Sequence, residues 1–210
     1  LNKEKIKKLR ERLAFDEALS HYIKLLVTKE KIKKNICHKI EVDNKIKEKI
    51  ISRIPFKLTE SQLKVIKEIE DDIKKENSML RLLQGDVGSG KTIVALITLV
   101  NVLKKNIQAA IMVPTEILAI QHYNYFSNLF KDTKVKIVLL TSKINSKEKE
   151  SIKKKIEDGE AQIIIGTHAI FQKNINFKKL GYVVIDEQHR FGVHQKFQLS
   201  AKGCNPHILV

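Results

Sequence analysis

The pattern of apolar and polar positions along the chain changes near Pro55. Before it, apolar residues recur near helical spacing among charged ones, as at Leu9, Leu13 and Tyr22, and no Gly or Pro interrupts them. A Pro after such a stretch is typical of a boundary. We therefore expect residues 1–54 to form a helical segment ahead of a separate domain that spans residues 55–210.

After Pro55, short apolar runs alternate with helix-like stretches. Thr59 followed by Gln62 has the spacing of a capping box, which predicts a helix from that point. Short apolar runs predict six buried strands, at Leu80–Leu83, Ala109–Val113, Val135–Leu140, Gln162–Ile165, Tyr182–Ile185 and His207–Val210. Helical spacing predicts helices at Ile93–Leu103, Glu116–Leu129 and Lys147–Glu157. The alternation predicts an α/β fold whose central parallel sheet has helices on both faces.

The chain is strongly basic. Its 210 residues include 40 Lys and Arg against 24 Asp and Glu, a formal net charge of +16. Such a surface attracts polyanions, so nucleic acid is a natural partner. The alternative is that the many Lys only coat solvated helix faces. No apolar run approaches the roughly 20 residues of a membrane span, and two distant Cys match no metal spacing. A cytoplasmic location is expected.

One glycine-rich segment matches the phosphate-binding pattern G-x-x-x-x-G-K-[ST], between a predicted strand and a predicted helix. Its glycines let backbone N–H groups point at phosphate oxygens. Lys91 is expected to reach the β- and γ-phosphates and the Thr92 hydroxyl to bind Mg²⁺. A chance glycine-rich turn is the alternative. The segment predicts an ATP site formed by Gly85, Asp86, Val87, Gly88, Ser89, Gly90, Lys91 and Thr92.

A second acidic element follows the apolar run Tyr182–Ile185. In a parallel sheet, the carboxyl end of that strand lies at the same edge as the phosphate loop. Asp186 is then placed to bind Mg²⁺, directly or through water, and Glu187 to polarise the attacking water. An acidic cap on the following turn is the alternative. Together with the loop, the two carboxylates predict ATP hydrolysis, with Lys91, Asp186 and Glu187 as the catalytic groups.

Several segments resemble the motifs of superfamily 2 helicases in the expected order. The run Asp186-Glu187-Gln188-His189 resembles the DExH motif II. Among the earlier segments, Phe56–Gln62 resembles the adenine-reading motif. Two segments resemble motifs that grip the DNA backbone, Val113–Glu116 and Gly166–Ala169. Leu140–Ser142 lies where a further backbone-contacting motif is found. The resemblance implies DNA contacts through Pro114, Thr115, Thr141, Gly166 and Thr167, and coupling through Gln188 and His189.

Longer runs resemble the RecG family in particular. They are Arg81–Thr92, Val184–Val193 and the preamble Arg12–Glu17. The related transcription–repair coupling translocases share the Arg-Phe-Gly-Val run, but usually have a second Glu where this chain has Gln188. The RecG resemblance implies an ATP- and Mg²⁺-dependent helicase that remodels stalled forks and branched recombination intermediates. This chain would then hold the first RecA-like motor lobe, and residues 1–54 would link a wedge domain to it.

The same resemblance sets expectations about the rest of the protein. Leu1 is not Met, and Val210 stands just ahead of the motif that follows in the family, so we expect the chain to be part of a longer polypeptide. A wedge domain, a second motor lobe and branched or forked DNA are the implied partners, and the implied state is a monomer at the bacterial nucleoid. Without the second lobe's arginine finger, poor hydrolysis is expected from the isolated lobe.

Some of these residues have a simpler alternative role. Gln62 either reads the adenine edge or only caps its helix, and Phe56 either stacks on the base or leads into that helix. Thr115 and Thr167 either donate to DNA phosphates or serve as ordinary N-caps. His189 either passes the nucleotide state to the DNA groove or has a structural role.

Two other functional classes compete with a DNA motor. A nucleotide-controlled switch is one, but it has no need of Glu187 to activate water. The other is a basic DNA-binding scaffold whose phosphate loop no longer functions, but Lys91, Thr92 and Asp186 are all present. Dependence of the ATP hydrolysis rate on DNA separates the motor from both.

Overall fold

The structure is a computed structural model that describes residues 10, 12–20, 22–23, 37, 40–42, 44–101, 103, 107–172, 174–186 and 205–210. The chain divides into two compact units, Leu1–Asn35 and Ile36–Val210. In the first unit, residues 12–20 are helical. No helix in the described ranges is long and apolar enough to cross a membrane.

The larger unit is built on a six-stranded sheet, in the order β1-β6-β5-β2-β4-β3. Every neighbouring pair is parallel, as the alternation of strands and helices predicted. The strands are β1 (Leu80–Arg81), β2 (Gln108–Met112), β3 (Ile137–Leu140), β4 (Ile163–Gly166), β5 (Leu180–Ile185) and β6 (His207–Leu209). Because all run the same way, the segments that follow them meet at one edge of the sheet.

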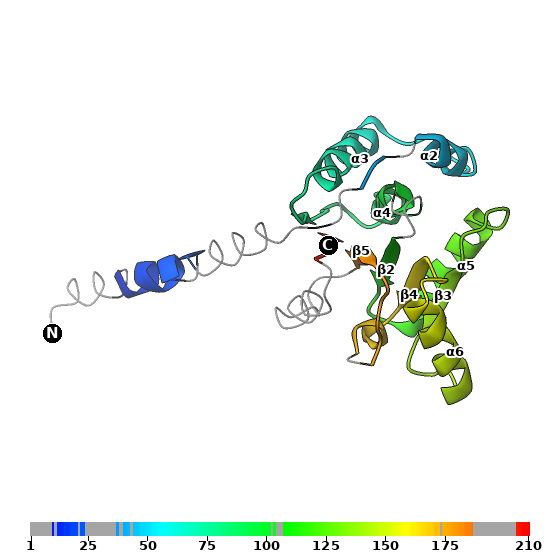
Figure 1. The fold of residues 1–210 in the computed structure, drawn as a ribbon. Helices are drawn as coiled ribbons and strands as arrows, with labels where there is room; N and C mark the ends of the chain where they lie inside the picture. The colour runs from blue at the N-terminus through cyan, green and yellow to red at the C-terminus, as the bar shows by residue number, and fades with distance from the viewer. Residues whose placement is uncertain are drawn as a thin grey trace. The chain divides into compact units, whose positions relative to one another are not determined.

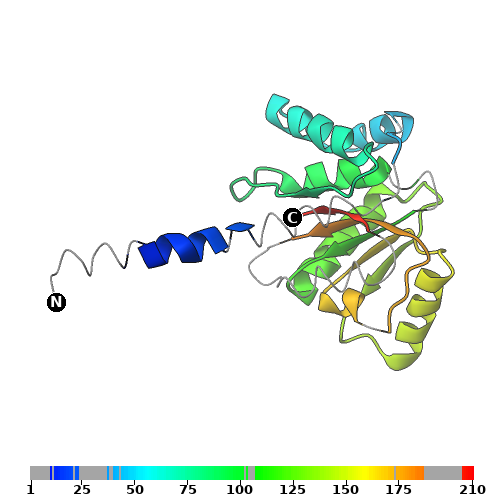
Figure 2. The same cartoon turned by 60° about the vertical axis from the view of Figure 1, so that its left-hand side comes forward.

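Helices cover both faces of this sheet (Figure 1). The core on one face includes residues of α4 (Lys91–Val100), α5 (Glu116–Leu129), and α2 (Asn44–Ile51) and α3 (Glu60–Ile73), the last two packed against α4. The other packs against α6 (Ser146–Glu157) and the short 3-10 helix η2 (His168–Phe171). Alternate residues of one strand serve the two faces: Ile111 of β2 joins the first core and Met112 the second. The turned view in Figure 2 shows α4 lying between α3 and the sheet.

The sequence places α3 accurately, because its capping box forms. Thr59 Oγ1 accepts from the Gln62 N–H at 3.2 Å, and Gln62 Oε1 accepts from the Thr59 N–H at 2.9 Å. At the end of α6, Gly159 has a φ of 74°, which is the left-handed conformation that follows many helices. The helix α5 has the predicted bounds, and α4 begins two residues before the predicted Ile93 and ends at Val100.

The compact unit begins at Ile36, ahead of the boundary expected at Pro55. Ile40, Ile50 and Ile54 are buried in the same core as α3 and α4, which ties these residues and α2 to the lobe. The Ile40 N–H donates to the Ile73 carbonyl at 3.1 Å, and neither Cys37 nor residues 40–42 are helical. Helix throughout residues 1–54 is therefore wrong at Cys37 and at residues 40–42.

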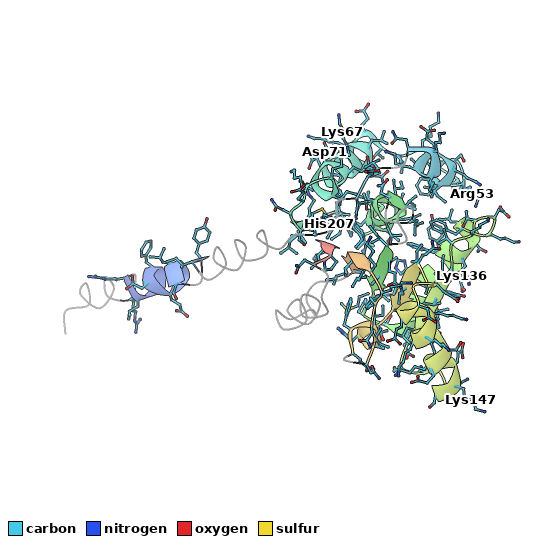
Figure 3. The ribbon with its side chains drawn as sticks, viewed as in Figure 1. Arg53, Lys67, Asp71, Lys136, Lys147 and His207 are labelled. Atoms are coloured by element: carbon cyan, nitrogen blue, oxygen red, sulfur yellow. The ribbon has the colours of Figure 1, made fainter. Side chains whose placement is uncertain are left out.

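Cys37 lies beside His207, the first residue of β6, which is labelled in Figure 3. The Met79 N–H donates to Nδ1 of the buried His207 at 3.2 Å, so Nε2 of the neutral ring carries the proton. That nitrogen lies 3.4 Å from Cys37 Sγ. Burial raises the pKa of the Cys37 thiol, which favours a neutral, structural side chain.

Candidate nucleotide and DNA site

The loop between β1 and α4 has the conformation that its glycines predict. Gly88 has a φ of 81°, and Gly90, at the N-cap of α4, has a φ of 83°. Side chains other than glycine rarely adopt this region. The Ser89 N–H donates to the Asp86 carbonyl at 3.2 Å, which closes the turn. The loop is exposed, and Val87 projects fully into solvent.

Lys91 places its charge at the centre of this loop. Its Nζ donates to the carbonyls of Gly85 at 2.7 Å and Asp86 at 2.8 Å. Lys91 also opens α4, whose N-terminus carries a partial positive charge. The ammonium group and the helix end together make a site for a multiply charged phosphate. Thr92 follows in the first turn of the helix and is partly exposed.

Gln62 joins the capping box to the phosphate loop. While its Oε1 accepts from Thr59, its Nε2 donates to the Ser89 carbonyl at 2.9 Å. Gly90 is needed for this approach, because a Cβ at that position would overlap Gln62 Nε2. The predicted adenine-reading residue therefore lies against the loop. The capping role is observed, and the adenine contact stays a prediction.

Phe56 lies beside an apolar hollow next to α3. The hollow has a volume of about 480 Å³ and is lined mainly by the end of α2 and the segment that leads into α3, with Phe56, Leu58 and Leu63 among its walls. Phe56 and Leu63 are each 50% exposed. An exposed aromatic face beside an apolar wall is suited to stack against a flat ring. Base stacking and the lead-in role both remain open for Phe56.

Asp186 directly follows β5, at the strand end where the sequence placed it. Its N–H donates to the Met112 carbonyl at 2.9 Å, and its side chain is 39% exposed. β5 and β1 are parallel to the strand between them, so Asp186 and the phosphate loop follow strand ends at one sheet edge. A Thr hydroxyl and an Asp carboxylate are hard oxygen donors, so Thr92 and Asp186 fit Mg²⁺. Glu187, Gln188 and His189 lie outside the described residues.

The predicted DNA-contact residues lie at the same sheet edge but differ in exposure. Thr115 caps α5, with its hydroxyl accepting from the Leu118 N–H at 3.3 Å, and follows the partly exposed Pro114. Thr167 is partly exposed, and its side chain makes no capping hydrogen bond to η2. Thr141 is only 4% exposed. Buried Gly166 serves packing, because a Cβ there would overlap the Leu140 carbonyl oxygen.

Glu116 joins two of these segments, a link that motif reasoning missed. Ser142 Oγ donates to Glu116 Oε1 at 2.8 Å, and Lys143 Nζ lies 3.0 Å from Oε2. The hydrogen bond from Ser142 and the nearby ammonium group of Lys143 hold the pKa of Glu116 below its usual range. Glu116 therefore holds the turn after β3 against the start of α5. The sequence contains these residues but gives no spacing rule that pairs them.

Three lysines of the described lobe lie on separate parts of its surface. Lys67, Lys136 and Lys147 lie well apart in Figure 3, on α3, ahead of β3 and on α6. Lys136 is paired with Glu160 at 2.9 Å, and Lys153 with Glu150 at 2.6 Å. These pairs fit the alternative that lysines coat solvated faces, which stays open beside a nucleic-acid role. A DNA site on this lobe has to be argued from its motifs.

Comparisons with known proteins agree with the motifs. Residues 59–206 match the family model described as DEAD/DEAH box helicase. "ATP-dependent DNA helicase RecG" of Aquifex aeolicus is 49% identical over 95% of this chain, and that of Thermotoga maritima is 41% identical over 94%. The chain spans 25% of the length of each of these relatives.

Solved structures show the same fold. "Structure of RecG bound to three-way DNA junction" has a TM-score of 0.84 and 40% identity, and covers 98% of this chain and 27% of that chain. The DUF1998 helicase MrfA, at 18% identity, has a TM-score of 0.61 over 80% of this chain and 29% of that chain. The more distant likeness extends to the fold alone.

Proposed function

This chain belongs to the DEAD/DEAH box helicase family and is a RecG-like motor lobe, and from that premise we propose that it binds ATP–Mg²⁺ to drive movement on branched DNA. One observation carries the proposal. The loop curled by Gly88 and Gly90 surrounds the Lys91 ammonium group at the sheet edge that also presents Asp186.

The proposed chemistry assigns separate tasks to the residues of this edge. Lys91 and the loop N–H groups hold the β- and γ-phosphates, and Thr92 and Asp186 hold Mg²⁺. Bound Mg²⁺ would neutralise the charge that develops on the phosphate oxygens. Glu187 polarises the attacking water as a general base. Gln188 and His189 couple the nucleotide state to DNA.

For the base, we propose that Gln62 and Phe56 provide the contacts. The Gln62 amide already lies on the Ser89 carbonyl, so a nucleotide in the loop would bring its base close to this side chain. The half-exposed Phe56 ring offers a stacking surface. A hydrogen-bonding amide and an apolar face together favour a purine ring over a sugar or a peptide.

For DNA, we propose backbone contacts through the turns at the same sheet edge. Pro114, Thr115 and Thr167 supply exposed or partly exposed hydroxyls and backbone groups, which is what phosphate contacts require, and the buried Gly166 shapes the turn ahead of Thr167. At the turn after β3 the accessible groups are Ser142 and Lys143, beside the buried Thr141. The likeness to RecG on a three-way junction supports branched or forked DNA as the substrate.

The setting of the lobe follows from the same premise. Its relatives are about four times its length, which supports a wedge domain and a second motor lobe as partners within one polypeptide, with residues 1–54 as the linker. We propose that this polypeptide acts as a monomer in the bacterial cytoplasm, at the nucleoid. RecG relatives support this reading over a transcription–repair coupling translocase or a nucleotide switch.

The experiment is an ATP hydrolysis assay on a polypeptide that joins this lobe to a second motor lobe. We expect hydrolysis to be stimulated more by a three-way junction than by a linear duplex of equal length. Glu187→Gln should abolish hydrolysis but keep nucleotide binding, because it removes the base and leaves the phosphate site. Hydrolysis that ignores DNA would instead identify a nucleotide switch.

A further inference from the structure

His122 of α5 has a largely buried side chain, and no sequence motif pointed to this residue. It lies two helical turns after the N-cap Thr115, and its side chain is 13% exposed. Its ring meets the ring of Phe126, one turn further on, edge to face with centroids 6.2 Å apart. Phe126 is fully packed in the core, so its ring gives His122 a fixed wall.

The other side of His122 faces the acidic end of β5. Its Nε2 lies 3.8 Å from Asp186 Oδ2. That separation is within the range of an ion pair and slightly longer than a direct hydrogen bond. A small rotation of the partly exposed carboxylate would shorten it to hydrogen-bond distance. Among described side chains, His122 thus brings a nitrogen to the carboxylate proposed to bind Mg²⁺.

We propose that His122 is a positioning residue that orients the Asp186 carboxylate and ties it to α5, the helix that starts at the DNA-contact segment. The inference rests on the proposed function, since it assigns a partner to the Mg²⁺ ligand of that function. Carboxylates that bind a metal are themselves held by hydrogen bonds, and loss of such a partner typically lowers metal affinity about 10–100-fold.

The placement of His122 on α5 adds a consequence for DNA coupling. The 14 residues of α5 form one rigid element, with Thr115 at its start and His122 near its middle. A shift of this helix when Thr115 and its neighbours engage DNA would move the His122 ring relative to Asp186. An element that contacts both sites in this way is the kind of link that coupling requires.

The competing explanation is that His122 only packs against Phe126. Packing alone predicts that replacing His122 lowers stability without a specific effect on Mg²⁺. Three variants separate the two: His122→Ala removes the ring, His122→Gln keeps an amide N–H donor, and Gln121→Ala changes the exposed neighbour on the same helix.

The test is Mg²⁺-dependent binding of a fluorescent, non-hydrolysable ATP analogue to this chain, with thermal unfolding measured in parallel. We expect His122→Ala to raise the Mg²⁺ concentration at half-saturation about tenfold or more. Binding in EDTA should be unchanged, His122→Gln should recover much of the loss, and Gln121→Ala should match the unmodified chain. An unchanged Mg²⁺ midpoint in folded His122→Ala would overturn the inference.

A double-variant comparison gives the second criterion. If His122 acts through Asp186, then His122→Ala should add nothing to Asp186→Asn in the Mg²⁺ midpoint. Full additivity of the two changes would show that His122 acts elsewhere. Failure of the proposed function looks different, because the unmodified chain would then bind the analogue equally well with Mg²⁺ and with EDTA, or would not bind it.

Discussion

The phosphate loop and the turn after β3 both follow a parallel strand at one edge of the sheet, yet they present different things to solvent. In the loop, positive-φ glycines turn the backbone outward and place the Lys91 ammonium group among carbonyls. After β3, the motif residue Thr141 is buried, while Ser142 and Lys143 are exposed and fastened to Glu116.

This difference shows what a motif specifies. A site that depends on backbone conformation can be predicted from its own residues, because only glycine adopts the required φ at low cost. A site made from side chains on a turn depends on what the turn packs against. Thr141 and Lys143 are two residues apart, yet Thr141 is buried and Lys143 is exposed, which the motif alone does not specify.

Gly90→Ala and Gly88→Ala test the backbone half of this comparison. Both put a side chain at positive φ, which costs about 1–2 kcal/mol. At Gly88 the new Cβ meets open space, whereas at Gly90 it displaces Gln62 Nε2 from the Ser89 carbonyl and loses a further bond worth about 0.5–1.5 kcal/mol. The thermal unfolding temperature should therefore fall further for Gly90→Ala than for Gly88→Ala. Equal losses would mean that the Gln62 contact contributes nothing.

Lys143→Ala and Thr141→Val test the side-chain half. If the exposed groups of the turn meet DNA, Lys143→Ala should weaken binding to a forked duplex and reduce the slope of log K against log salt by about 0.9. The buried Thr141→Val should leave that slope alone. The measurement is a salt series of DNA titrations with the helicase polypeptide. A slope that changes only with Thr141→Val would instead support Thr141 as the DNA contact, as the motif predicted.

The smallest expected effect concerns the ion pair between α3 and β1, the strand that precedes the phosphate loop. Arg81 of β1 donates to Asp72 of α3 at 2.6 and 2.9 Å. Partial burial raises the pKa of Asp72, but hydrogen bonds from Lys75 and Arg81 outweigh it and leave this pKa below the usual value. The stabilisation is present above the unfolded pKa and is lost as pH falls through the folded one.

Asp72→Asn is the matched variant for this pair. Because the pair is partly solvated, we expect a loss of at most about 1 kcal/mol near neutral pH. The difference between Asp72→Asn and the unmodified chain should shrink toward zero as the solution is acidified below the carboxyl range. Chemical denaturation at several pH values measures it, and a difference that grows in acid would refute this assignment.

Much of the lobe was readable from periodicity because each element is long or strongly apolar. The capping box at Thr59 and Gln62, the bounds of α5 and the positions of all six strands follow from spacing alone. The prediction of a buried strand over Leu80–Leu83 was wrong, because β1 covers only Leu80–Arg81 at the sheet edge and Leu80 is 42% exposed. The conformation of residues 40–42, ahead of α2, did not follow from spacing, since the Lys-rich pattern around them is typical of a helix, whereas they are not helical and Ile40 bonds to the distant Ile73 carbonyl.

The site shows the same division. Lys91 and Asp186 were predictable because a motif and a strand end place them. The contact of His122 with Asp186 was not, because they lie 64 positions apart in the chain and only the packing of α5 on the sheet brings them together. The same holds for Glu116 and Ser142. Pairs made by tertiary packing leave no local signature in a single sequence.

The most direct measurement is a titration of this chain with a fluorescent ATP analogue in Mg²⁺, beside Lys91→Ala and a surface control, Lys149→Ala. Loss of a charged hydrogen-bonding group from the loop should cost about 1.5–3 kcal/mol, or roughly ten- to a hundredfold in affinity. We predict tight binding by the unmodified chain and by Lys149→Ala, with that loss in Lys91→Ala. Equal binding by all three folded proteins would contradict the nucleotide site and the motor function built on it.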